Sequence, residues 1–529
     1  MAGIVEASAQ HPKPEGALFS YGTAGFRMKA NLLDSVMFRV GLLAGLRSKR
    51  LGGQTIGVMV TASHNVPEDN GVKLVDPMGE MLEASWEQYA TLLANSTTDE
   101  ELLENYELVF KKANIRADVP ANVVYARDTR ESGPALVQSL VDALNAAGTK
   151  SQDYGILTTP QLHYVVRCIN TKGAYGEPTE EGYYRKIGDA YRVLMKGKHQ
   201  NGPITIDAAN GVGAPKMKKL AEYIGKDHFD YKIINDDVDT PSKLNHNCGA
   251  DYIKTQQRMP PGTPVQPGAR YASFDGDADR LMYFYIDFDN TFHMLDGDKI
   301  ATLAASFIGD LARASGLNGL RIGVVQTAYA NGASTAYIQK SLQLPTICTP
   351  TGVKHLHHAA LKYDCGVYFE ANGHGTVLFS PACLSTIASH EAQSPAQKTA
   401  LDSLQALTDL INQTVGDALS DLLMVEVILA HKGWSPKEWD STYTDLPNRL
   451  VRVEVNDRTI FQTTDAERKL VSPEGLQERI DALVGKYKLG RAFARASGTE
   501  NAVRVYSESQ TRGETDELAM KVRDLVAQF

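Results

Sequence analysis

Short runs of apolar, often β-branched residues recur along the chain, and each run ends in a loop of small or polar residues. These runs cover residues 55–60, 123–126, 204–206, 271–274, 322–325 and 367–369. Between them apolar residues recur at helical spacing, as in 134–147, 216–224 and 299–314. Strands that alternate with helices predict α/β units with parallel or mixed sheets. Ligands bind such sheets at the carboxyl ends of strands, where these loops lie.

The C-terminal part of the chain follows a different pattern. Residues 434–439 and 446–449 are rich in proline, tryptophan and charge, which favours a linker, and we place a hinge near 434–449. The predicted strands that follow are 450–455, 491–495 and 503–506, and the predicted helices are 473–484 and 515–527. This order is typical of a compact α+β domain.

We therefore expect an α/β protein with three mixed α/β domains and a smaller C-terminal α+β domain. The expected boundaries are 1–178, 179–298, 299–435 and 436–529. The triplet Ala-Asn-Gly occurs at 209–211, 330–332 and 371–373. Its first two copies follow predicted strands, which is a weak indication of duplicated α/β units.

Composition excludes several classes of protein. The chain has 529 residues, of which 43% are apolar and 22% charged, as in an ordinary globular protein. A net charge of −9 argues against nucleic acid or an anionic membrane as the main partner, although a local arginine cluster can still bind an anionic substrate. We expect a small-molecule substrate and no obligate protein partner.

The cysteines and the N-terminal residues indicate the compartment. The five cysteines are scattered and form no Cys-x-x-Cys pair, which favours a reducing environment over a disulfide scaffold or a zinc site. Residues 1–16 are polar and contain two prolines, unlike a signal peptide. No run approaches the roughly 18 apolar residues of a membrane span. We expect a cytoplasmic enzyme.

Asp275, Asp277 and Asp279 lie in the sequence Asp-Gly-Asp-Ala-Asp-Arg. In a straight strand these side chains would share one face but spread over about 13 Å. Gly276 and Ala278 allow the chain to curl and bring the carboxylates together. An oxygen-only ligand set favours magnesium, and the spacing is not that of an EF-hand. A solvated acidic turn is the alternative, although an apolar run follows at once.

An incoming phosphate would need positive partners beside these carboxylates. Arg280 adjoins the aspartate loop, and Arg27 ends a second glycine-bearing turn at 22–27. Planar guanidinium groups match the oxygens of phosphate.

Ser63 follows the apolar run 55–60 in the sequence Thr-Ala-Ser-His-Asn. His64 is not automatically its base, because neighbouring side chains in an extended chain point apart. A polar loop then returns Lys73 toward the same region. The serine could simply cap a turn, but beside a metal-binding loop it favours phosphoryl transfer over a serine–histidine–aspartate hydrolase.

Two further loops have the composition of substrate-binding segments. Residues 370–375 place hydrogen-bonding side chains between small residues, which suits sugar hydroxyls, and residues 495–504 combine hydroxyls, a glycine and two arginines, which suits a phosphate. The candidate substrate-binding residues are Glu370, Ala371, Asn372, His374, Arg495, Ala496, Ser497, Gly498, Thr499, Asn501 and Arg504. Lys354 is a further candidate for proton transfer. We assign the nearby His357 and His358 to a helix surface.

These motifs, in this order, resemble the α-D-phosphohexomutase superfamily. The similar segments are the serine loop 61–65, the metal loop 275–280, the sugar loop 370–375, the phosphate loop 495–501 and the turn 22–27. The Glu-Ala-Asn-Gly-His-Gly sugar loop and the segment 175–184 are similar to the branch that acts on N-acetylglucosamine phosphates. Glucose and mannose phosphate mutases usually carry a Gly-Glu-x-Ser-Gly type loop instead.

The resemblance implies a heart-shaped, four-domain enzyme in which Ser63 is phosphorylated. It implies that Mg²⁺ binds the phosphoserine together with Asp275, Asp277 and Asp279. It further implies interconversion of N-acetylglucosamine 6-phosphate and 1-phosphate through a 1,6-bisphosphate, which also acts as activator, and a supply of precursor for UDP-N-acetylglucosamine.

Several alternatives remain open from the sequence. Catalytic roles are expected for Ser63, His64, Lys73, Arg27 and Lys354, but His64, Lys73 and Lys354 all remain candidates for the general base. The chain could act on glucose or mannose phosphates, or it could release phosphate as a phosphatase. A non-catalytic binding protein of the same fold is a third alternative, although such relatives lose the serine or an aspartate.

Overall fold

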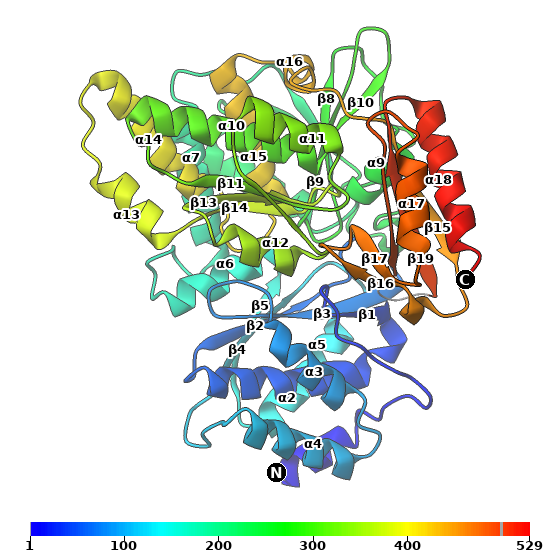
Figure 1. Cartoon of the computed structure of the whole chain (residues 1–529). Helices are drawn as coiled ribbons and strands as arrows, with labels where there is room; N and C mark the ends of the chain where they lie inside the picture. The colour runs from blue at the N-terminus through cyan, green and yellow to red at the C-terminus, as the bar shows by residue number, and fades with distance from the viewer. Residues whose placement is uncertain (1, 498–500) are drawn as a thin grey trace. The chain divides into compact units, whose positions relative to one another are not determined.

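The computed structural model describes residues 2–497 and 501–529, which form two compact units (Figure 1). Unit 1 comprises Met1–Asp296 and Gln405–Gly433, and unit 2 comprises Gly297–Leu404 and Trp434–Phe529. The chain thus leaves unit 1 after Asp296, returns to it within α14 (Pro395–Leu410) and leaves it again after Gly433.

The first sheet of unit 1 has the strand order β1-β3-β2-β4-β5. Strands β2, β4 and β5 are parallel, whereas β3 is antiparallel to both β2 and β1. The bounds are β1 (Phe26–Lys29), β2 (Thr55–Val60), β3 (Asp69–Val75), β4 (Asn122–Arg127) and β5 (Lys150–Ile156). The prediction of a strand at 55–60 is confirmed to the residue, and the mixed pairing confirms the predicted type of sheet.

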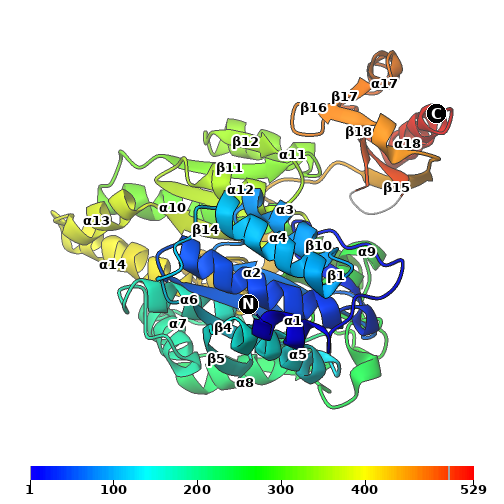
Figure 2. The same cartoon turned by 90° about the horizontal axis from the view of Figure 1, so that it is seen from below.

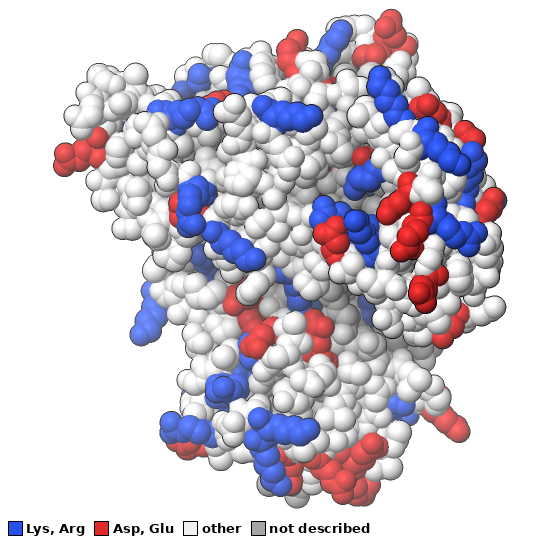
Figure 3. Space-filling model, in the orientation of Figure 1, with Lys and Arg blue, Asp and Glu red and all other residues white. Residues whose placement is uncertain are grey.

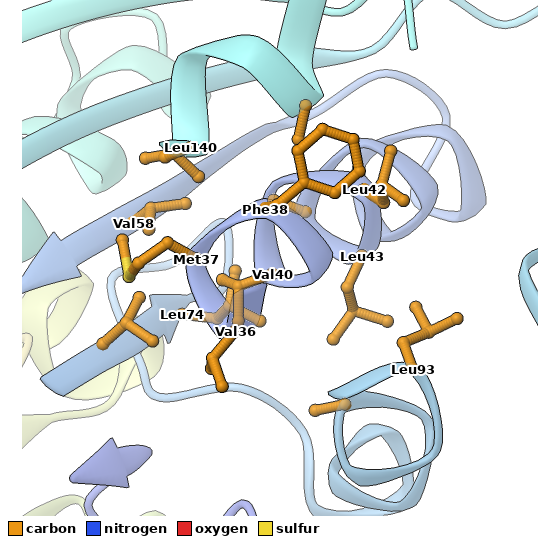
Figure 4. Packing of buried hydrophobic residues seen from close by; sticks show 14 of the residues in the cluster. Val36, Met37, Phe38, Val40, Leu42, Leu43, Val58, Leu74, Leu93 and Leu140 are labelled. Atoms are coloured by element: carbon orange, nitrogen blue, oxygen red, sulfur yellow. The ribbon is translucent and has the colours of Figure 1, made fainter. Parts of the chain in front are cut away.

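Apolar residues on both faces of β2 explain why it forms the centre of this sheet. Val58 and its alternate neighbours pack into the larger core with α2, whereas Met59 packs on the opposite side with residues of α6. A strand buried on both faces is a continuous apolar run rather than an alternating one. In the larger core, α2 presents Val36, Met37, Phe38, Val40, Leu42 and Leu43 to Val58, Leu74, Leu93 and Leu140 (Figure 4).

The helices of unit 1 cover both faces of its sheets. Helices α2 and α5 lie side by side on the N-terminal sheet (Figure 2). The bounds are α1 (Ala2–Ser8), α2 (Asp34–Arg50), α3 (Ala84–Ala94), α4 (Asp99–Lys112), α5 (Gly133–Ala146), α6 (Thr159–Asn170), α7 (Glu180–Leu194), α8 (Gly213–Ile224), α9 (Ala250–Gln256) and α15 (Ala418–Lys432). Helix α15, from the returning segment, packs against α7 and β9.

The second sheet of unit 1 has the order β10-β9-β8-β6-β7. Strands β8, β6 and β7 are parallel, and β9 is antiparallel to β8 and to β10. The bounds are β6 (Ile204–Asp207), β7 (Tyr231–Ile234), β8 (Arg270–Phe274), β9 (Leu281–Ile286) and β10 (Phe292–Leu295).

Unit 2 contains a sheet of order β12-β11-β13-β14 and a C-terminal sheet of order β15-β19-β18. In the first of these β12, β11 and β13 are parallel and β14 is antiparallel, whereas the C-terminal sheet is antiparallel throughout. The strands are β11 (Ile322–Thr327), β12 (Thr346–Thr349), β13 (Cys365–Phe369), β14 (Gly375–Phe379), β15 (Asn448–Glu454), β18 (Arg491–Ala496) and β19 (Ala502–Glu508). A separate hairpin consists of β16 (Gln462–Thr464) and β17 (Lys469–Ser472).

The helices of unit 2 begin with α10, which packs against β11 and β13. The bounds are α10 (Gly297–Ser315), α11 (Gly332–Ala336), α12 (Val353–Ala360), α13 (Pro381–Ser389), α16 (Pro436–Asp440), α17 (Leu476–Val484) and α18 (Arg512–Val526). The proposed linker contains α16, whose Trp439 is fully buried and donates its ring N–H to the carbonyl of Lys299 on α10, 3.2 Å away.

The three α/β sheets share one local topology. In each, the last strand of the parallel block is followed by a short loop and then by its antiparallel neighbour, as β2 by β3, β8 by β9 and β13 by β14. The first two Ala-Asn-Gly triplets follow β6 and β11, which occupy equivalent places in their sheets. The third triplet instead lies between β13 and β14. The repeated topology thus agrees with the indication of duplicated units from the first two copies.

Surface charge, helix length and the state of the cysteines bear on the expected partners and compartment. On the face shown in Figure 3, acidic and basic side chains of the described residues are interspersed, with no broad basic surface of the kind that binds nucleic acid. Within residues 2–497 and 501–529, no helix combines the length and apolar character needed to cross a membrane. All five cysteines are free thiols.

Candidate active site

Ser63 lies three residues beyond the end of β2, in the loop that leads to β3. Its backbone adopts the left-handed conformation at φ 52°, and its side chain is buried. The amide N–H of Ser63 donates to Thr61 Oγ1 at 3.0 Å, and Ser63 Oγ donates to Asp275 Oδ2 at 2.6 Å. The turn thus directs the predicted nucleophile toward the predicted metal loop.

The three aspartates of the metal loop converge as the sequence predicts. The loop between β8 and β9 curls through Ala278 at φ 59°, and Asp275 Oδ1 accepts the amide N–H groups of Asp279 and Arg280 at 3.0 and 3.2 Å. One oxygen from each carboxylate lies within 4.8 Å of the others. Gly276 is required, because a Cβ there would lie 2.6 Å from the carbonyl oxygen of Ser63. This close approach keeps the two loops together.

Two further elements of unit 1 hold the metal loop. At the start of α6, the Thr159 hydroxyl donates to Asp277 Oδ2 at 2.6 Å and its amide to the Asp277 carbonyl at 3.2 Å. At the start of α15, Ala418 N–H donates to the carbonyl of Ala278 at 3.0 Å. Asp277 Oδ1 is buried without a hydrogen-bond partner among the described residues. A buried, unbonded carboxylate oxygen among oxygen-only ligands fits a hard divalent cation.

The charges around this loop are only partly balanced by the protein. Burial, and then the nearby Asp279 and Asp277, raise the pKa of Asp275 well above its ordinary value. Lys73 Nζ lies 3.3 and 3.2 Å from Asp277 and Asp279. Burial alone would lower the pKa of Lys73, but these carboxylates outweigh burial and raise it. Lys73 is therefore a charged ammonium group rather than a neutral base in this arrangement.

Arg27 lies close to His64 and Asn65 of the serine loop. Arg27 Nη1 is 3.5 Å from His64 Nδ1 and donates to Asn65 Oδ1 at 3.3 Å. Burial, followed by the charges of Arg280 and Arg27, lowers the pKa of His64 to about 2. Such an imidazole is neutral at ordinary pH and a weak base. Arg280 Nε lies 3.8 Å from Asp275 Oδ2, so Arg280 is grouped with the metal loop as predicted.

The predicted sugar loop is the turn between β13 and β14 in unit 2. Asn372 forms two hydrogen bonds within this turn: it donates to Glu370 Oε2 at 3.3 Å and accepts from the His374 N–H at 3.0 Å. Gly373 takes φ 87°, which a side chain would disfavour. Glu370, Ala371 and Asn372 remain half-exposed, whereas His374 is buried. The side chains best placed to contact a ligand are therefore Glu370 and Asn372.

The predicted phosphate loop follows β18. Arg495 and Arg504 are cross-strand partners on β18 and β19, and Ser497 N–H donates to the Ala502 carbonyl at 2.8 Å. Arg495 Nε donates to Tyr329 Oη at 3.0 Å, and its Nη1 lies 3.3 Å from Glu467 Oε1. Ala496 is half-buried and Asn501 exposed, at the two edges of the turn. Gly498 and Thr499 lie outside the described residues.

Lys354 lies in the first turn of α12, close in sequence to Thr351, whose amide donates to Glu467 Oε2 at 2.9 Å. Glu467 therefore joins the α12 loop to Arg495 within unit 2. His358 is exposed on the surface of α12, as expected, and the half-buried His357 hydrogen-bonds Tyr368 Oη at 3.0 Å.

The structure thus brings Ser63, the three aspartates, Lys73 and Arg280 together in unit 1, with Arg27 and His64 beside them. In unit 2 it brings Arg495, Arg504 and Ser497 together at one turn. The sequence analysis assigned no role to several residues that hold these loops: Asp128, Arg130, Thr159, Asn245, Arg458 and Glu467. The one signal in the sequence that could have identified any of them is a position just after a predicted strand. It applied only to Asp128 and Arg130.

Comparison with protein families gives a consistent assignment over most of the chain. Residues 179–282 and 296–434 match the models described as Phosphoacetylglucosamine mutase AMG1, domains II and III. Residues 47–102 and 93–175 match the phosphoglucomutase/phosphomannomutase α/β/α domain I, and 450–525 match the C-terminal domain of that group.

Individual relatives are similar over nearly their whole length. Phosphoacetylglucosamine mutase 2 of Schizosaccharomyces pombe is 51% identical, over 99% of this chain and 97% of the relative. The structure of Aspergillus fumigatus N-acetylphosphoglucosamine mutase with GlcNAc-6P and magnesium is 60% identical, with a TM-score of 0.96 and coverage of 100% and 98%. A second structure of that fungal enzyme, with glucose 1,6-bisphosphate, has the same identity, TM-score and coverage.

Proposed function

The chain belongs to the phosphoacetylglucosamine mutase family, and we propose that it interconverts N-acetylglucosamine 6-phosphate and N-acetylglucosamine 1-phosphate. The fungal relative whose structure contains GlcNAc-6P and magnesium supports this substrate. The observation that carries the proposal is the 2.6 Å hydrogen bond from Ser63 Oγ to Asp275, which joins a candidate nucleophile to the acidic triad.

Phosphoryl transfer in both directions at Ser63 accounts for the isomerisation. The 1-hydroxyl of the sugar attacks the phosphorus of phosphoserine 63, the bond from phosphorus to Ser63 Oγ breaks, and the sugar becomes the 1,6-bisphosphate. The hydroxyl proton leaves the sugar, and Ser63 Oγ gains one. After the bisphosphate turns around, Ser63 attacks the 6-phosphate in the same way and releases the 1-phosphate. The bisphosphate is thus intermediate and, when added, activator.

Asp275, Asp277 and Asp279 fit Mg²⁺, because their oxygens converge and one of them is buried without a hydrogen bond. When bound, the ion would draw negative charge from the transferring phosphoryl group. Lys73, Arg27 and Arg280 supply positive charge from the protein itself. The ammonium group of the lysine and the guanidinium groups of the arginines can donate hydrogen bonds to the phosphoryl oxygens during transfer. The phosphoserine oxygen is the proposed fourth ligand.

Substrate recognition is proposed for the two loops of unit 2. Arg495, Ser497 and Arg504, with Gly498, Thr499 and Asn501, would bind the phosphate that does not react. Glu370 and Asn372 would bind sugar hydroxyls, with Ala371 and His374 shaping the turn. Because the sugar must bind in two opposite orientations, the loop has to accept similar hydroxyl patterns from either side.

The general base is proposed to be neither His64 nor Lys73 in its resting state. His64 is a weak base, with a pKa of about 2, and the pKa of Lys73 is raised by the carboxylates beside it. Lys354 therefore remains the candidate of the original three. A loose transition state needs little help from a base, which lessens the demand on any one residue.

Place in metabolism follows from the product. N-acetylglucosamine 1-phosphate has the activated position that nucleotide-sugar synthesis uses, so we propose that the enzyme supplies UDP-N-acetylglucosamine formation. A cytoplasmic location is proposed because all five cysteines are free thiols, as a reducing compartment would keep them. The four domains with boundaries 1–178, 179–298, 299–435 and 436–529 stay a prediction.

A mutase assay tests the function directly. The enzyme is incubated with Mg²⁺ and a trace of 1,6-bisphosphate, and N-acetylglucosamine, glucose and mannose phosphates are compared while free phosphate is recorded. The expected result is isomerisation with preference for the acetamido sugar and little phosphate release. Preference for glucose or mannose would overturn the substrate, and phosphate release without isomerisation would overturn the mutase mechanism.

A further inference from the structure

A buried arginine just after a neighbouring strand forms hydrogen bonds with the loop that carries Ser63. Arg130 follows β4, which pairs with β2 in the N-terminal sheet, and its side chain is fully shielded from solvent. A charged group in this position requires a specific set of acceptors, because burying it without them is strongly unfavourable.

Four backbone carbonyls between Ser63 and Asp69 supply those acceptors. Arg130 Nη1 donates to Val66 at 2.6 Å and to Asp69 at 2.8 Å. Arg130 Nη2 donates to Ser63 at 3.0 Å and to Asn65 at 2.9 Å. One planar guanidinium therefore fixes the loop from Ser63 to the first residue of β3.

Asn245 holds two of the same carbonyls from another part of unit 1. Its Nδ2 donates to Ser63 O at 2.9 Å and to Asn65 O at 3.0 Å. Each of these carbonyls thus accepts from both Arg130 and Asn245, which uses both lone pairs of the oxygen. Asn245 belongs to the segment between β7 and α9, so it ties the serine loop to the part of the chain that carries the metal loop.

Asp128 sets the guanidinium in place and links it to the nucleophile. Its carboxylate accepts from Arg130 N at 3.0 Å and Arg130 Nε at 3.2 Å. The same carboxylate accepts the Thr61 hydroxyl at 2.6 Å, and Thr61 Oγ1 accepts the Ser63 N–H. The loop is therefore bonded at the N–H of Ser63 and at its carbonyl.

This arrangement has a consequence for the reaction. The left-handed region is unfavourable for a non-glycine residue, so Ser63 needs outside contacts to stay there. The carbonyl oxygen of Ser63 is also the atom nearest to where a side chain at position 276 of the metal loop would begin, 2.6 Å from the Cβ position. We propose that Arg130 and Asn245 are positioning residues that fix the Ser63 carbonyl, and through it Ser63 Oγ, against the aspartate loop for phosphoryl transfer. This inference rests on the proposed function.

Arg130→Lys is the first test, with Arg39→Lys as its matched control. Arg39 is also buried in unit 1 and donates to backbone carbonyls, those of His11, Ser35 and Ser96, but none belongs to the serine loop. A lysine keeps the charge beside Asp128 but lacks the planar fork. We expect Arg130→Lys to lower kcat roughly 100-fold with KM changed by less than about threefold. Arg39→Lys should lower the unfolding temperature while kcat stays within about twofold.

Asn245→Gly and Asn247→Gly form a second pair, should Arg130→Lys fail to fold. Both asparagines adopt positive φ, 56° and 54°, where glycine is unstrained, so each substitution removes only the side chain. Asn247 is exposed and contacts His246. We expect kcat to fall roughly 10-fold in Asn245→Gly. Asn247→Gly should match the wild type.

Amide hydrogen exchange over residues 64–70 provides a readout that is independent of turnover. Exchange there should be faster in Arg130→Lys and Asn245→Gly and unchanged in both controls. If exchange changes as expected but the wild type does not isomerise sugar phosphates, the positioning inference survives and the proposed function fails. An active wild type whose kcat is unaffected by Arg130→Lys and Asn245→Gly would overturn the inference. Equal losses of kcat in the controls would also overturn it.

Discussion

Ser63 Oγ donates a 2.6 Å hydrogen bond to Asp275 Oδ2, although 212 positions separate the two residues. Each lies in the loop between the last strand of a parallel block and its antiparallel neighbour, one in each sheet of unit 1. The repeated topology therefore supplies the same kind of loop twice, and the sequence gives one a hydroxyl and the other a carboxylate cluster. A cation held by that cluster would lie beside Ser63 Oγ.

Removing the hydroxyl of Ser63 should abolish turnover. Alanine has no oxygen to accept the phosphoryl group, so Ser63→Ala should lower steady-state mutase activity roughly 10³-fold or more. The unfolding temperature should stay close to that of the wild type, because one polar atom is lost. Intact-mass measurement should show a phosphorylated wild type and an unphosphorylated variant. Steady-state activity retained in the variant would remove Ser63 from the nucleophilic role.

Asp277→Asn should weaken binding of a divalent cation. Asparagine keeps the shape of the side chain but removes one negative charge and the ligand oxygen, so the apparent Kd for Mg²⁺ or Mn²⁺ should rise roughly 10-fold or more. Calorimetric titration of the cation measures this directly. Asp289→Asn, an exposed residue between β9 and β10, is the control and should bind as the wild type does. Equal affinities in all three proteins would contradict the metal assignment.

Arg495→Lys should weaken the interaction with the substrate phosphate. Lysine cannot reproduce the guanidinium fork, and the loss of one charge-assisted hydrogen bond corresponds to about 1.5–3 kcal/mol, or roughly a 10- to 100-fold rise in KM. Arg504→Ala, at its cross-strand partner, should act in the same direction. Arg468→Lys, which replaces an exposed arginine paired with Asp465, is the control. An unchanged KM in both Arg495→Lys and Arg504→Ala would refute the phosphate-loop assignment.

Asp421 should make stability depend on pH. It is buried on α15, and burial, then the nearby Asp417, raises its pKa well above the ordinary value of 3.8. The folded protein therefore binds a proton that the unfolded chain has lost, so stability present below the unfolded pKa is lost as pH rises through the folded pKa. Asp421→Asn removes this loss and should stabilise the protein by about 1–3 kcal/mol near about pH 8.

Thermal unfolding at several pH values checks this prediction. The difference between Asp421→Asn and the wild type should shrink toward about pH 4, where the unfolded carboxyl is also protonated. Asp409→Asn is the control, because Asp409 is an exposed partner of Lys186 at 3.5 Å and should change stability little. A difference that is constant across the pH range would show that the carboxyl charge is not its cause.

The predicted strands correspond closely to the observed ones because their patterns are simple. The strand β2 is buried at every position, so its apolar run is unambiguous. The hairpin of β16 and β17 was not predicted, since its strands are short and mostly polar and exposed. The helix α16, inside the segment 434–449 predicted as a linker, was not predicted, because only contact with α10 reveals that Trp439 is buried.

Residue types identified the chemistry, but not how the site is held. Three aspartates within five residues predict a metal site whatever the fold, because few other arrangements tolerate that charge. Arg130 and Asn245, by contrast, contact Ser63 across 67 and 182 positions. Arg130 shares its position after a predicted strand with many loop residues, and nothing near Asn245 in the sequence distinguishes it from an ordinary loop residue.

The sequence by itself therefore determined the strand-and-helix alternation, the candidate nucleophile and the acidic triad, since these depend on local pattern and on the chemistry of single side chains. Only the tertiary structure decided that Ser63 meets Asp275, that Lys73 stays charged and that His64 is a weak base. The reason is physical. Hydrogen bonds and the pKa of a buried group depend on distances between atoms far apart in the chain, and folding alone sets those distances.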